Sequence, residues 1–463
     1  MNNELKPYPE YKDSGFEWIG NIPKNWGYMK LKRIASVELS NIDKKSRDNE
    51  IDVVLCNYVD VYYNNIITPD LNFMKATAKQ SQIDKFKLRK GTVLITKDSE
   101  TPNDIGVPAW VSENMENVIC GYHLAQIKPS EKVIGKYLFY MLLSSKVNEQ
   151  LHSLANGVTR YGISKSDIEN SVFLVPKQEI QKSIINFLDQ KTSEIDALIS
   201  DKEKLITLLE EKRQAVITET VTKGLDPNVK MKDSGIEWIG EIPEHWEVVK
   251  LKHLSNHSFK YGANESAESD NPNQPRYIRI TDLTDEGNLK NETFKSLPFN
   301  IAEKYPVEKG DILFARSGAT VGKTYIHKSD EVASYAGYLI RYRPSKKIAL
   351  PEYIYYFTKS LIYREWIERS LIQATIENIS AEKYANLKIP LTNTNEQGKI
   401  IKFLNEYYAE TDDVLNHLNK QITKLKEYRE SLIYEAVTGK IDLRNYGEEP
   451  ELLVAERGEP YGN

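Results

Sequence analysis

The sequence contains little cysteine and no long hydrophobic run. Among its 463 residues, Cys56 and Cys120 are the two cysteines, and they lie far apart in the chain. Two cysteines exclude a disulfide framework and a cysteine-based zinc site, and they fit a reducing cytoplasm. No run of 18 apolar residues is present, which excludes a transmembrane helix, and the N-terminus lacks the apolar segment of a signal peptide. We therefore expect a cytoplasmic protein that makes no contact with a membrane.

The chain also lacks an excess of basic residues. It has 62 Lys and Arg against 67 Asp and Glu, a net charge of -5, which excludes a nucleic-acid binder that is basic throughout. Charge is distributed unevenly, because 73–177 holds 14 basic against 10 acidic residues and 276–347 holds 13 against 9. Salt screens charges beyond about 10 Å, so these segments can act locally. Ordinary fluctuation explains the same counts, and both interpretations stay open.

Two pairs of segments show that the chain is an internal duplication. Residues 11–32 and 231–252 are identical at 14 of 22 positions, and 178–226 matches 394–442 at 18 of 49 positions without a gap. Two such matches in the same order do not arise by chance, so two copies of one plan meet near residue 226. The copies have drifted between these ends. The pattern indicates one scaffold that presents two modules for related tasks on different targets.

The second part of each copy predicts a long helix. Positions reached from Ile184 by alternating steps of four and three are apolar at seven of 11, and they include Leu198 and Leu205. The same frame from Ile400 is apolar at eight of 11, counting tyrosine, and includes Val414. A heptad seam of about five heptads predicts a coiled coil. Neither seam has a partner within its own copy, so we expect the two helices to pack on each other.

The first part of each copy predicts an α+β domain. Short β-like runs, such as Asp52–Val61 and Tyr277–Thr281, alternate with turn residues. Helical stretches at 135–153 and 351–371 are mixed with them. We expect a globule of about 165 residues in each copy.

One glycine-rich segment comes near to a phosphate-binding motif. Residues 317–324 read SGATVGKT, but only three residues separate Gly318 from Gly322, and Ser317 stands in place of the first glycine. The residues that follow are typical of a strand and turn, so the helix N-terminus that a phosphate needs is missing. A glycine-rich hairpin and a loop that contacts DNA are the alternatives. No nucleophile elbow, dinucleotide fingerprint or nuclease cluster is present, and we expect no covalent chemistry.

Histidine and tryptophan are residue types that often occur in metal sites and nucleic-acid sites. His245, His253 and His257 fit no standard zinc spacing, so a structural or surface role is expected. Four tryptophans recur at equivalent positions of the two copies, among them Trp26 and Trp246. We expect these tryptophans to anchor the core of the frame.

Taken together, these segments resemble the specificity subunit of Type I restriction–modification systems. The resemblance is carried by DSGFEWIGNIPKNW and its repeat DSGIEWIGEIPEHW, by GDILFARSG, by the run from NGVTRYGISKSDIENSVFLVPKQEI into the first long helix, and by the helix ending EAVTGKID. It covers nearly the whole chain. The Pro-Pro usual before the long helix is missing, because Lys177 follows Pro176 and Leu391 follows Pro390.

The resemblance implies an α+β fold with two pseudo-symmetric α+β target-recognition domains, separated by two long antiparallel coiled-coil helices. In this sequence the expected parts are target-recognition domain 1 at 1–177, long helix 1 at 178–224, target-recognition domain 2 at 225–393, long helix 2 at 394–440 and an acidic C-terminal tail at 441–463. Each domain would read one half of a bipartite double-stranded DNA site across a spacer that is not read. Because the two modules differ, the site should be asymmetric.

The resemblance also implies partners. Two modification (methyltransferase) subunits would bind along the helices, and restriction (motor–nuclease) subunits would join them. S-adenosylmethionine, ATP and magnesium would belong to those subunits, so we expect neither a cofactor nor a metal in this chain.

Groove chemistry suggests which side chains could contact DNA. Arginine pairs with guanine, asparagine and glutamine with adenine, and threonine with the thymine methyl group, while most contacts go to phosphate. The candidates in copy one are Lys97, Ser99, Thr101, Asn103, Asn156, Thr159, Arg160 and Tyr161. Those in copy two are Arg279, Arg316, Ser317, Thr320, Lys323, Gln373, Thr375 and Asn378.

Two other functions stay open from the residues alone. One is a coiled-coil scaffold with two globular ends, which would show no sequence-specific DNA binding. The other is a nucleotide hydrolase that uses Gly318–Thr324.

Overall fold

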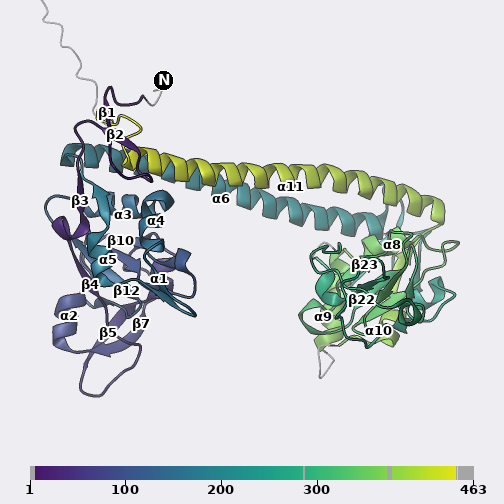
Figure 1. Cartoon of the computed structure of the whole chain (residues 1–463). Coiled ribbons are helices and arrows are strands. Elements are labelled where there is room, and N and C mark those ends of the chain that lie inside the picture. Colours follow the sequence, from purple (N-terminus) through teal and green to yellow (C-terminus); the bar gives the residue numbers. More distant parts are fainter. Residues whose placement is uncertain (1–5, 285–286, 373–377, 445, 447–463) are drawn as a thin grey trace, which may run out of the picture. The chain divides into compact units, whose positions relative to one another are not determined.

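The chain folds into two compact units (Figure 1). The computed structural model describes residues 6–284, 287–372, 378–444 and 446. Unit 1 joins Met1–Asp201 with Lys420–Asn463, and unit 2 is Lys202–Asn419. Each unit combines an α+β domain, here called domain 1 and domain 2, with part of two long helices.

Domain 1 is built around a five-stranded sheet in the order β4-β12-β8-β10-β6. Its strands are Ala35–Leu39, Leu124–Pro129, Val93–Thr96, Pro108–Val111 and Ile66–Ile67. The β12 strand pairs antiparallel with β4 and β8, and β8 pairs antiparallel with β10. All four residues of β8 are buried, because neighbouring strands flank it and helix α3 contacts it. The loop after this central strand is therefore fixed in place.

A second sheet of domain 1 has the order β11-β5-β7, formed by Val118–Cys120, Ile51–Cys56 and Met74–Ala78. Cys56 and Cys120 are register partners in it, and both are buried and free. The strand expected to continue to Val61 ends at Cys56. The Asp60 carboxylate accepts a hydrogen bond of 2.7 Å from the backbone N–H of Asn57, which fixes the start of helix α1, Tyr58–Tyr62.

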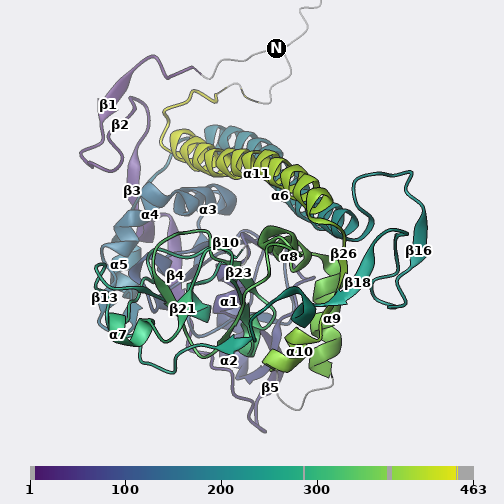
Figure 2. The same cartoon turned by 90° about the vertical axis from the view of Figure 1, so that its right-hand side faces the viewer.

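Two helices cover the sheet of domain 1 on the side of the long helices. They are α3, Gly135–Leu143, and α4, Ser145–His152, and both views place them between the sheet and the long helices (Figures 1 and 2). In α3, Tyr140 donates a hydrogen bond of 2.6 Å to Asp189, and Lys136 forms an ion pair of 2.6 Å with the same carboxylate. This polar cluster helps to attach domain 1 to the first long helix.

Domain 2 repeats this plan. Its main sheet has the order β19-β25-β22-β23, formed by Lys260–Tyr261, Leu339–Tyr342, Ile312–Ala315 and Thr324–Ile326. A second sheet has the order β20-β24-β21, formed by Arg276–Ile278, Ala333–Tyr335 and Pro306–Val307. Helices α8, Pro351–Phe357, and α9, Leu361–Ile372, take the places of α3 and α4. Tyr356 of α8 donates to Asn405 at 2.5 Å, as Tyr140 does to Asp189.

The two long helices are α6, Gln178–Lys223, and α11, Thr394–Val437. In unit 1, Arg429 Nε lies 2.8 Å from Asp196 Oδ1. In unit 2, Arg213 Nη2 lies 2.6 Å from Asp412 Oδ1. Arg213 is equivalent to Arg429 in the duplication, and Asp196 is equivalent to Asp412. In one pair α6 supplies the arginine, and in the other α11 supplies it. The helix pair therefore keeps the symmetry of the duplication.

The helix seam differs from the expected frame at every second position. Leu198 and Leu205 are 50% and 44% exposed, whereas Ile199 is only 8% exposed and Ile206 is half-buried. In α11, Val414 of the expected frame is likewise exposed, whereas Thr411 and Leu418 on either side of it are buried. At these positions the residue that faces the partner helix is therefore the one directly after the residue in the expected frame.

Two tryptophans that recur in the two copies fix the ends of the long helices. Trp26 and Trp246 are almost fully buried. Trp246 packs beside Gly224, which ends α6, and its indole N–H donates to Glu396 at 3.2 Å. Trp26 packs beside Gly439 just after α11. The expected core role of these two tryptophans is confirmed.

The fold class is confirmed: the chain contains two related α+β domains and a pair of long antiparallel helices. Among the helices of the described residues, none combines the length and the apolar character that crossing a bilayer requires.

Candidate functional site

In domain 1 the candidates from distant parts of the sequence meet on a small three-stranded ribbon. Its order is β13-β14-β9, formed by Asn156–Gly157, Tyr161–Gly162 and Asp98–Ser99, and Tyr161 is the register partner of Ser99. The ribbon forms where the loop after β8 meets the hairpin that follows α4. Six of the predicted residues lie on it or directly beside it: Lys97, Ser99, Asn156, Thr159, Arg160 and Tyr161.

The charge centre of this ribbon is Asp98. Lys97 Nζ lies 2.6 Å from one of its carboxylate oxygens and Arg160 Nη2 lies 2.9 Å from the other, which also contacts His123 Nδ1. Burial raises the pKa of Asp98, but the hydrogen bond and charge of Lys97, followed by those of His123, outweigh it and lower this pKa. One ionised carboxylate therefore orders several basic side chains, and Arg160 remains exposed.

The loop that follows is fixed from inside the domain. Ser99 is buried, and its hydroxyl lies 3.1 Å from the Tyr58 hydroxyl. The Thr101 hydroxyl donates a hydrogen bond of 2.8 Å to the Asp104 carboxylate. The Tyr62 hydroxyl also donates to Asp104, at 3.1 Å. Ser99 is therefore a scaffold residue. Asn103 lies in the short turn Pro102–Asp104 and is exposed.

Domain 2 brings together the equivalent segments. The residue after β22 is Arg316, whose backbone oxygen accepts a hydrogen bond of 2.8 Å from Ile379, and Ser317 pairs with Asn378 in an antiparallel bridge. The Arg316 guanidinium lies over the Tyr261 ring at 4.9 Å. Thr320 lies in the turn that follows. Gln373 and Thr375 lie outside the described residues.

The glycine-rich segment forms the hairpin that the sequence suggested. Strands β22 and β23 pair antiparallel on either side of it, and Gly318–Thr320 forms a single short turn. Because a strand follows the loop, no helix N-terminus is placed at it. Lys323 borders a separate hollow together with Gln214 and Arg364. It is thus set apart from the other candidates.

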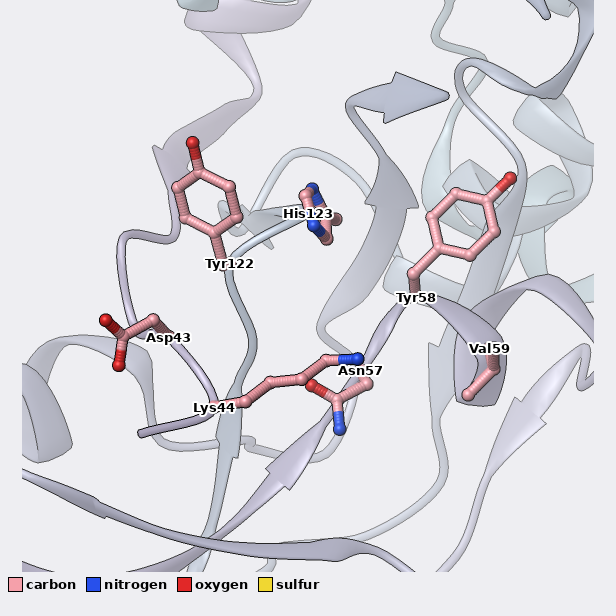
Figure 3. A pocket seen from close by; sticks show the side chains of 7 residues that line it. All are labelled: Asp43, Lys44, Asn57, Tyr58, Val59, Tyr122 and His123. Atoms are coloured by element: carbon pink, nitrogen blue, oxygen red, sulfur yellow. The ribbon is translucent and has the colours of Figure 1, made fainter. Parts of the chain in front are cut away.

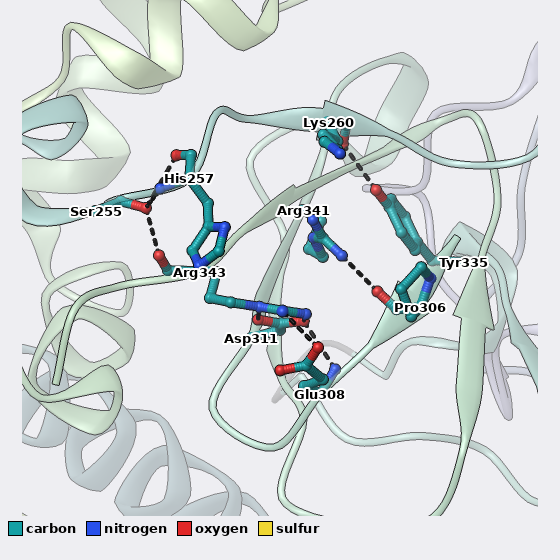
Figure 4. Close-up of polar contacts among 9 residues, drawn as sticks. All are labelled: Ser255, His257, Lys260, Pro306, Glu308, Asp311, Tyr335, Arg341 and Arg343. Carbon is teal, nitrogen blue, oxygen red and sulfur yellow. Dashed lines mark hydrogen bonds and ion pairs between the residues drawn. The ribbon is translucent and has the colours of Figure 1, made fainter. Parts of the chain in front are cut away.

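Two further features show what holds the domain 2 site. Arg279 is bound through Nη2 to Asp282, which is fully buried, at 2.7 Å, so most of its hydrogen-bonding capacity is used within the fold. At the opposite end of β22, Arg343 donates from Nε and Nη2 to the two oxygens of buried Asp311, each at 2.7 Å (Figure 4). This bidentate pair anchors the strand that carries Arg316.

A hollow lies beside the ribbon of domain 1. Its volume is about 170 Å³, and Figure 3 shows Tyr122 and Asp43 on one side and Asn57, Tyr58 and Val59 on the other. Tyr122 is 47% exposed, and Lys97 Nζ lies 4.6 Å from the centroid of its ring. Sequence reasoning missed these residues.

Domain 2 has a larger hollow at the corresponding place. Its volume is about 840 Å³. Tyr338, Asn264, Arg279, Ser317 and Thr320 are among the residues that line it. The alignment of Gly121-Tyr122 with Gly337-Tyr338 was the one sequence signal that could have pointed to both hollows.

The histidines that were considered as metal ligands have other roles. His245 contacts Glu396 at 2.9 Å, and His253 and His257 are exposed. Within the described ranges no group of three His, Cys, Asp or Glu residues is placed to hold a metal ion.

Comparison with known proteins identifies what this arrangement resembles. The family model described as the Type I restriction modification DNA specificity domain matches residues 23–208 and 243–424. The MjaVIII specificity subunit of a Type I restriction enzyme from Methanocaldococcus jannaschii is 26% identical over 458 residues, covering 94% of this chain and 98% of the relative. The EcoBI specificity subunit from Escherichia coli is 23% identical over 362 residues, covering 76% and 75%.

Solved structures share the fold. A structure from a study of complex assembly and conformational transition in the type I R-M system has a TM-score of 0.69 at 15% identity, covering 91% of this chain and 99% of that chain. The crystal structure of the HsdS subunit from Thermoanaerobacter tengcongensis has a TM-score of 0.50 at 16% identity, covering 91% and 98%.

Proposed function

The chain belongs to the family of Type I restriction–modification DNA specificity subunits, and from this premise we propose how its two domains work. Domain 1 and domain 2 each read one half of a bipartite, asymmetric site in double-stranded DNA. The observation that carries this proposal recurs in both domains: two loops far apart in sequence meet at the end of a buried strand, and they carry basic and amide side chains. The loops form the three-stranded ribbon in domain 1 and meet through the Ser317–Asn378 bridge in domain 2. Arginine and asparagine at such a place can contact phosphates and base edges.

The partners follow from the family. Two modification subunits and, where the system has them, restriction subunits assemble with this chain. The exposed apolar side chains of the long helices, such as Leu205, Leu208 and Tyr428, support the helices as the place of contact. S-adenosylmethionine, ATP and magnesium act in those partner subunits. The chain itself supplies recognition without catalysis, and it works in the cytoplasm, where the DNA is.

The alternatives are weaker. A hydrolase that uses Gly318–Thr324 would need a phosphate cradle, and the hairpin geometry does not supply one. A coiled-coil scaffold alone would not require candidate loops that meet at equivalent places in the two domains.

A domain exchange tests the proposal. Residues 253–392 are replaced by the equivalent region of a related specificity subunit, and the methylated motif is determined by methylation sequencing of cells that carry the exchanged chain. One half-site should change, while the other half-site and the spacer stay as in the wild type. A change in both half-sites together would contradict two independent readers.

A further inference from the structure

The hollow in each domain is built around the same three residue types, an asparagine, a glycine and a tyrosine. Asn57, Gly121 and Tyr122 meet in domain 1, and Asn264, Gly337 and Tyr338 meet in domain 2. In each case an asparagine follows the last residue of a segment that pairs parallel with the segment before the glycine. The glycine N–H donates to the backbone oxygen just before the asparagine, Cys56 at 2.8 Å and Ala263 at 2.7 Å.

Close packing makes glycine necessary at both places. A Cβ on Gly121 would lie 2.8 Å from the Cys56 oxygen and 2.9 Å from Asn57 Oδ1. A Cβ on Gly337 would lie 2.0 Å from Asn264 Oδ1. The glycine therefore lets the asparagine amide lie directly against the strand end, where it borders the hollow. Both tyrosines stay exposed, Tyr122 at 47% and Tyr338 at 63%.

The remaining walls of the hollows differ. Asp43, Lys44 and His123 complete the hollow of domain 1. Glu265, Arg279 and Thr320 contribute to the hollow of domain 2. Two copies that have diverged this far have therefore kept one asparagine and one tyrosine and changed the groups around them. A shared contact surrounded by different neighbours is what two readers of different half-sites need.

We propose that Asn57 and Asn264 are equivalent base-reading residues, each of which recognises an adenine in the half-site of its own domain. An asparagine amide offers one donor and one acceptor in the spacing of adenine N6 and N7. The hydroxyl of the exposed tyrosine beside it can bind a phosphate and so fix the position of the duplex relative to the asparagine. The differing walls select the other bases. This proposal rests on the proposed function, because it assumes that each domain reads DNA.

The test uses the full chain in complex with its methyltransferase subunits. Asn57→Ala and Asn264→Ala are compared with Asn64→Ala and Asn273→Ala, which change asparagines outside the two hollows. Methylation sequencing gives the motif of each variant. Competition binding with duplexes that differ at one base pair gives the discrimination at each position. Thermal unfolding of each variant shows that the fold is retained.

Asn57→Ala should make one adenine position of one half-site degenerate, with discrimination there reduced about tenfold, and Asn264→Ala should do the same in the other half-site. The control variants should keep the wild-type motif. Unchanged discrimination in both hollow variants, relaxation at a position other than adenine, or an equal loss of affinity for all duplexes would overturn the inference. A wild-type complex without sequence preference would instead refute the proposed function.

Discussion

Asp98 shows how a single half-buried acid can prepare a basic surface. Lys97, His123 and Arg160 all contact its carboxylate, so their positions are set before any DNA arrives. A long basic side chain that is already ordered loses less conformational entropy when it binds a phosphate or a base. Because Arg160 keeps 56% of its side chain exposed, it can exchange part of its contact with Asp98 for a contact with DNA.

The first prediction concerns Arg160. Arg160→Ala should weaken DNA binding by the complete complex, and if the guanidinium contacts phosphate, the slope of log K against log salt should become shallower by about one. If it contacts guanine instead, one position of the half-site becomes degenerate. Fluorescence anisotropy over a range of salt concentrations measures the slope. Arg47→Ala is the matched control, because Arg47 is equally exposed and ion-paired but lies outside the ribbon; equal effects of the two variants would contradict the assignment.

The second prediction concerns His327. Burial lowers its pKa, outweighing the opposing effects of the Glu331 carbonyl and of Asp311. In the unfolded chain the same histidine binds a proton near pH 6.5, so below that pH the unfolded state takes up more protons than the folded state. The stability that neutral His327 contributes is therefore present above about pH 6.5 and is lost as the pH falls from there towards the lowered folded-state pKa.

Thermal unfolding between pH 7.5 and 5.5 checks this. His327→Gln should show a smaller decrease of the unfolding temperature over this interval than the wild type. His253→Gln changes an exposed histidine and should keep the wild-type pH dependence. A pH dependence of His327→Gln equal to that of the wild type would show that this histidine does not couple to folding.

At single positions, the sequence predicted residue chemistry better than residue role. Arg160 and Asn156 are exposed on the ribbon, whereas Ser99 and Arg279 are used within the fold. Asn57 and Asn264 were missed because 207 positions separate them, whereas 220 separate the matched openings of the two copies. Insertions and deletions of this size hide an equivalence that only backbone geometry makes visible.

At the scale of elements, a helix or strand could be predicted wherever its apolar pattern fitted only one kind of secondary structure. The long helices carry a sustained seam, and the central strands β8 and β22 are short apolar runs that end in turns. The run 52–61 was mistaken for one strand, because its alternating apolar residues fit a strand while the contact between Asn57 and Asp60 starts a helix. Ladders such as β12 with β4 could not be predicted, since their partners lie far apart in sequence.

The predicted frame of the helix seam agrees with the buried positions only in part, and the reason is physical. Positions such as Leu188 and Ile195 are buried as expected, but at every second position the next residue along the helix faces inward. Near its start α6 also packs against its own domain, where Ile184, Ile185 and Phe187 are all buried. A helix that serves two partners carries a broader apolar face than a two-stranded seam requires, so alternative frames fit the sequence equally well.

The third prediction separates the two frames. Ile199→Ala should lower the free energy of unfolding by about 2–4 kcal/mol, because it leaves a cavity in a covered seam. Leu198→Ala should cost less than about 1 kcal/mol, because this side chain is 50% exposed. Chemical denaturation of both variants measures the difference. Equal costs, or a larger cost for Leu198→Ala, would restore the frame expected from the sequence.

For the whole molecule, duplication explains why the opening motif of the first copy and the end of α11 belong to the same unit. The Tyr11 hydroxyl donates a hydrogen bond of 3.1 Å to the backbone oxygen of Gly439. The Tyr434 hydroxyl donates a hydrogen bond of 3.2 Å to the backbone oxygen of Trp18. Unit 1 therefore holds the start of the chain and the end of α11 together. In unit 2, Trp246 packs at the end of α6 in the same manner. Each opening motif thus binds the end of a long helix.

The fourth prediction concerns the length of the long helices. Both helices pass from one unit into the other without a break, and the boundary between the units crosses them at Asp201–Lys202 and Asn419–Lys420. One heptad adds about 10 Å to a helix, which is close to three base pairs at about 3.4 Å each. Inserting a heptad after Lys202 and another after Leu418 keeps both seams in phase and leaves the candidate loops of both domains untouched.

Methylation sequencing should therefore show an unread spacer that is longer by about three base pairs, with both half-sites unchanged. Activity should fall, because each reader must also follow the turn of the DNA groove. Insertions of three or five residues put the seam after each insertion out of phase with the seam before it, so these variants should fail to assemble. An active heptad variant with the wild-type spacer would mean that the helices do not set the distance between the two half-sites.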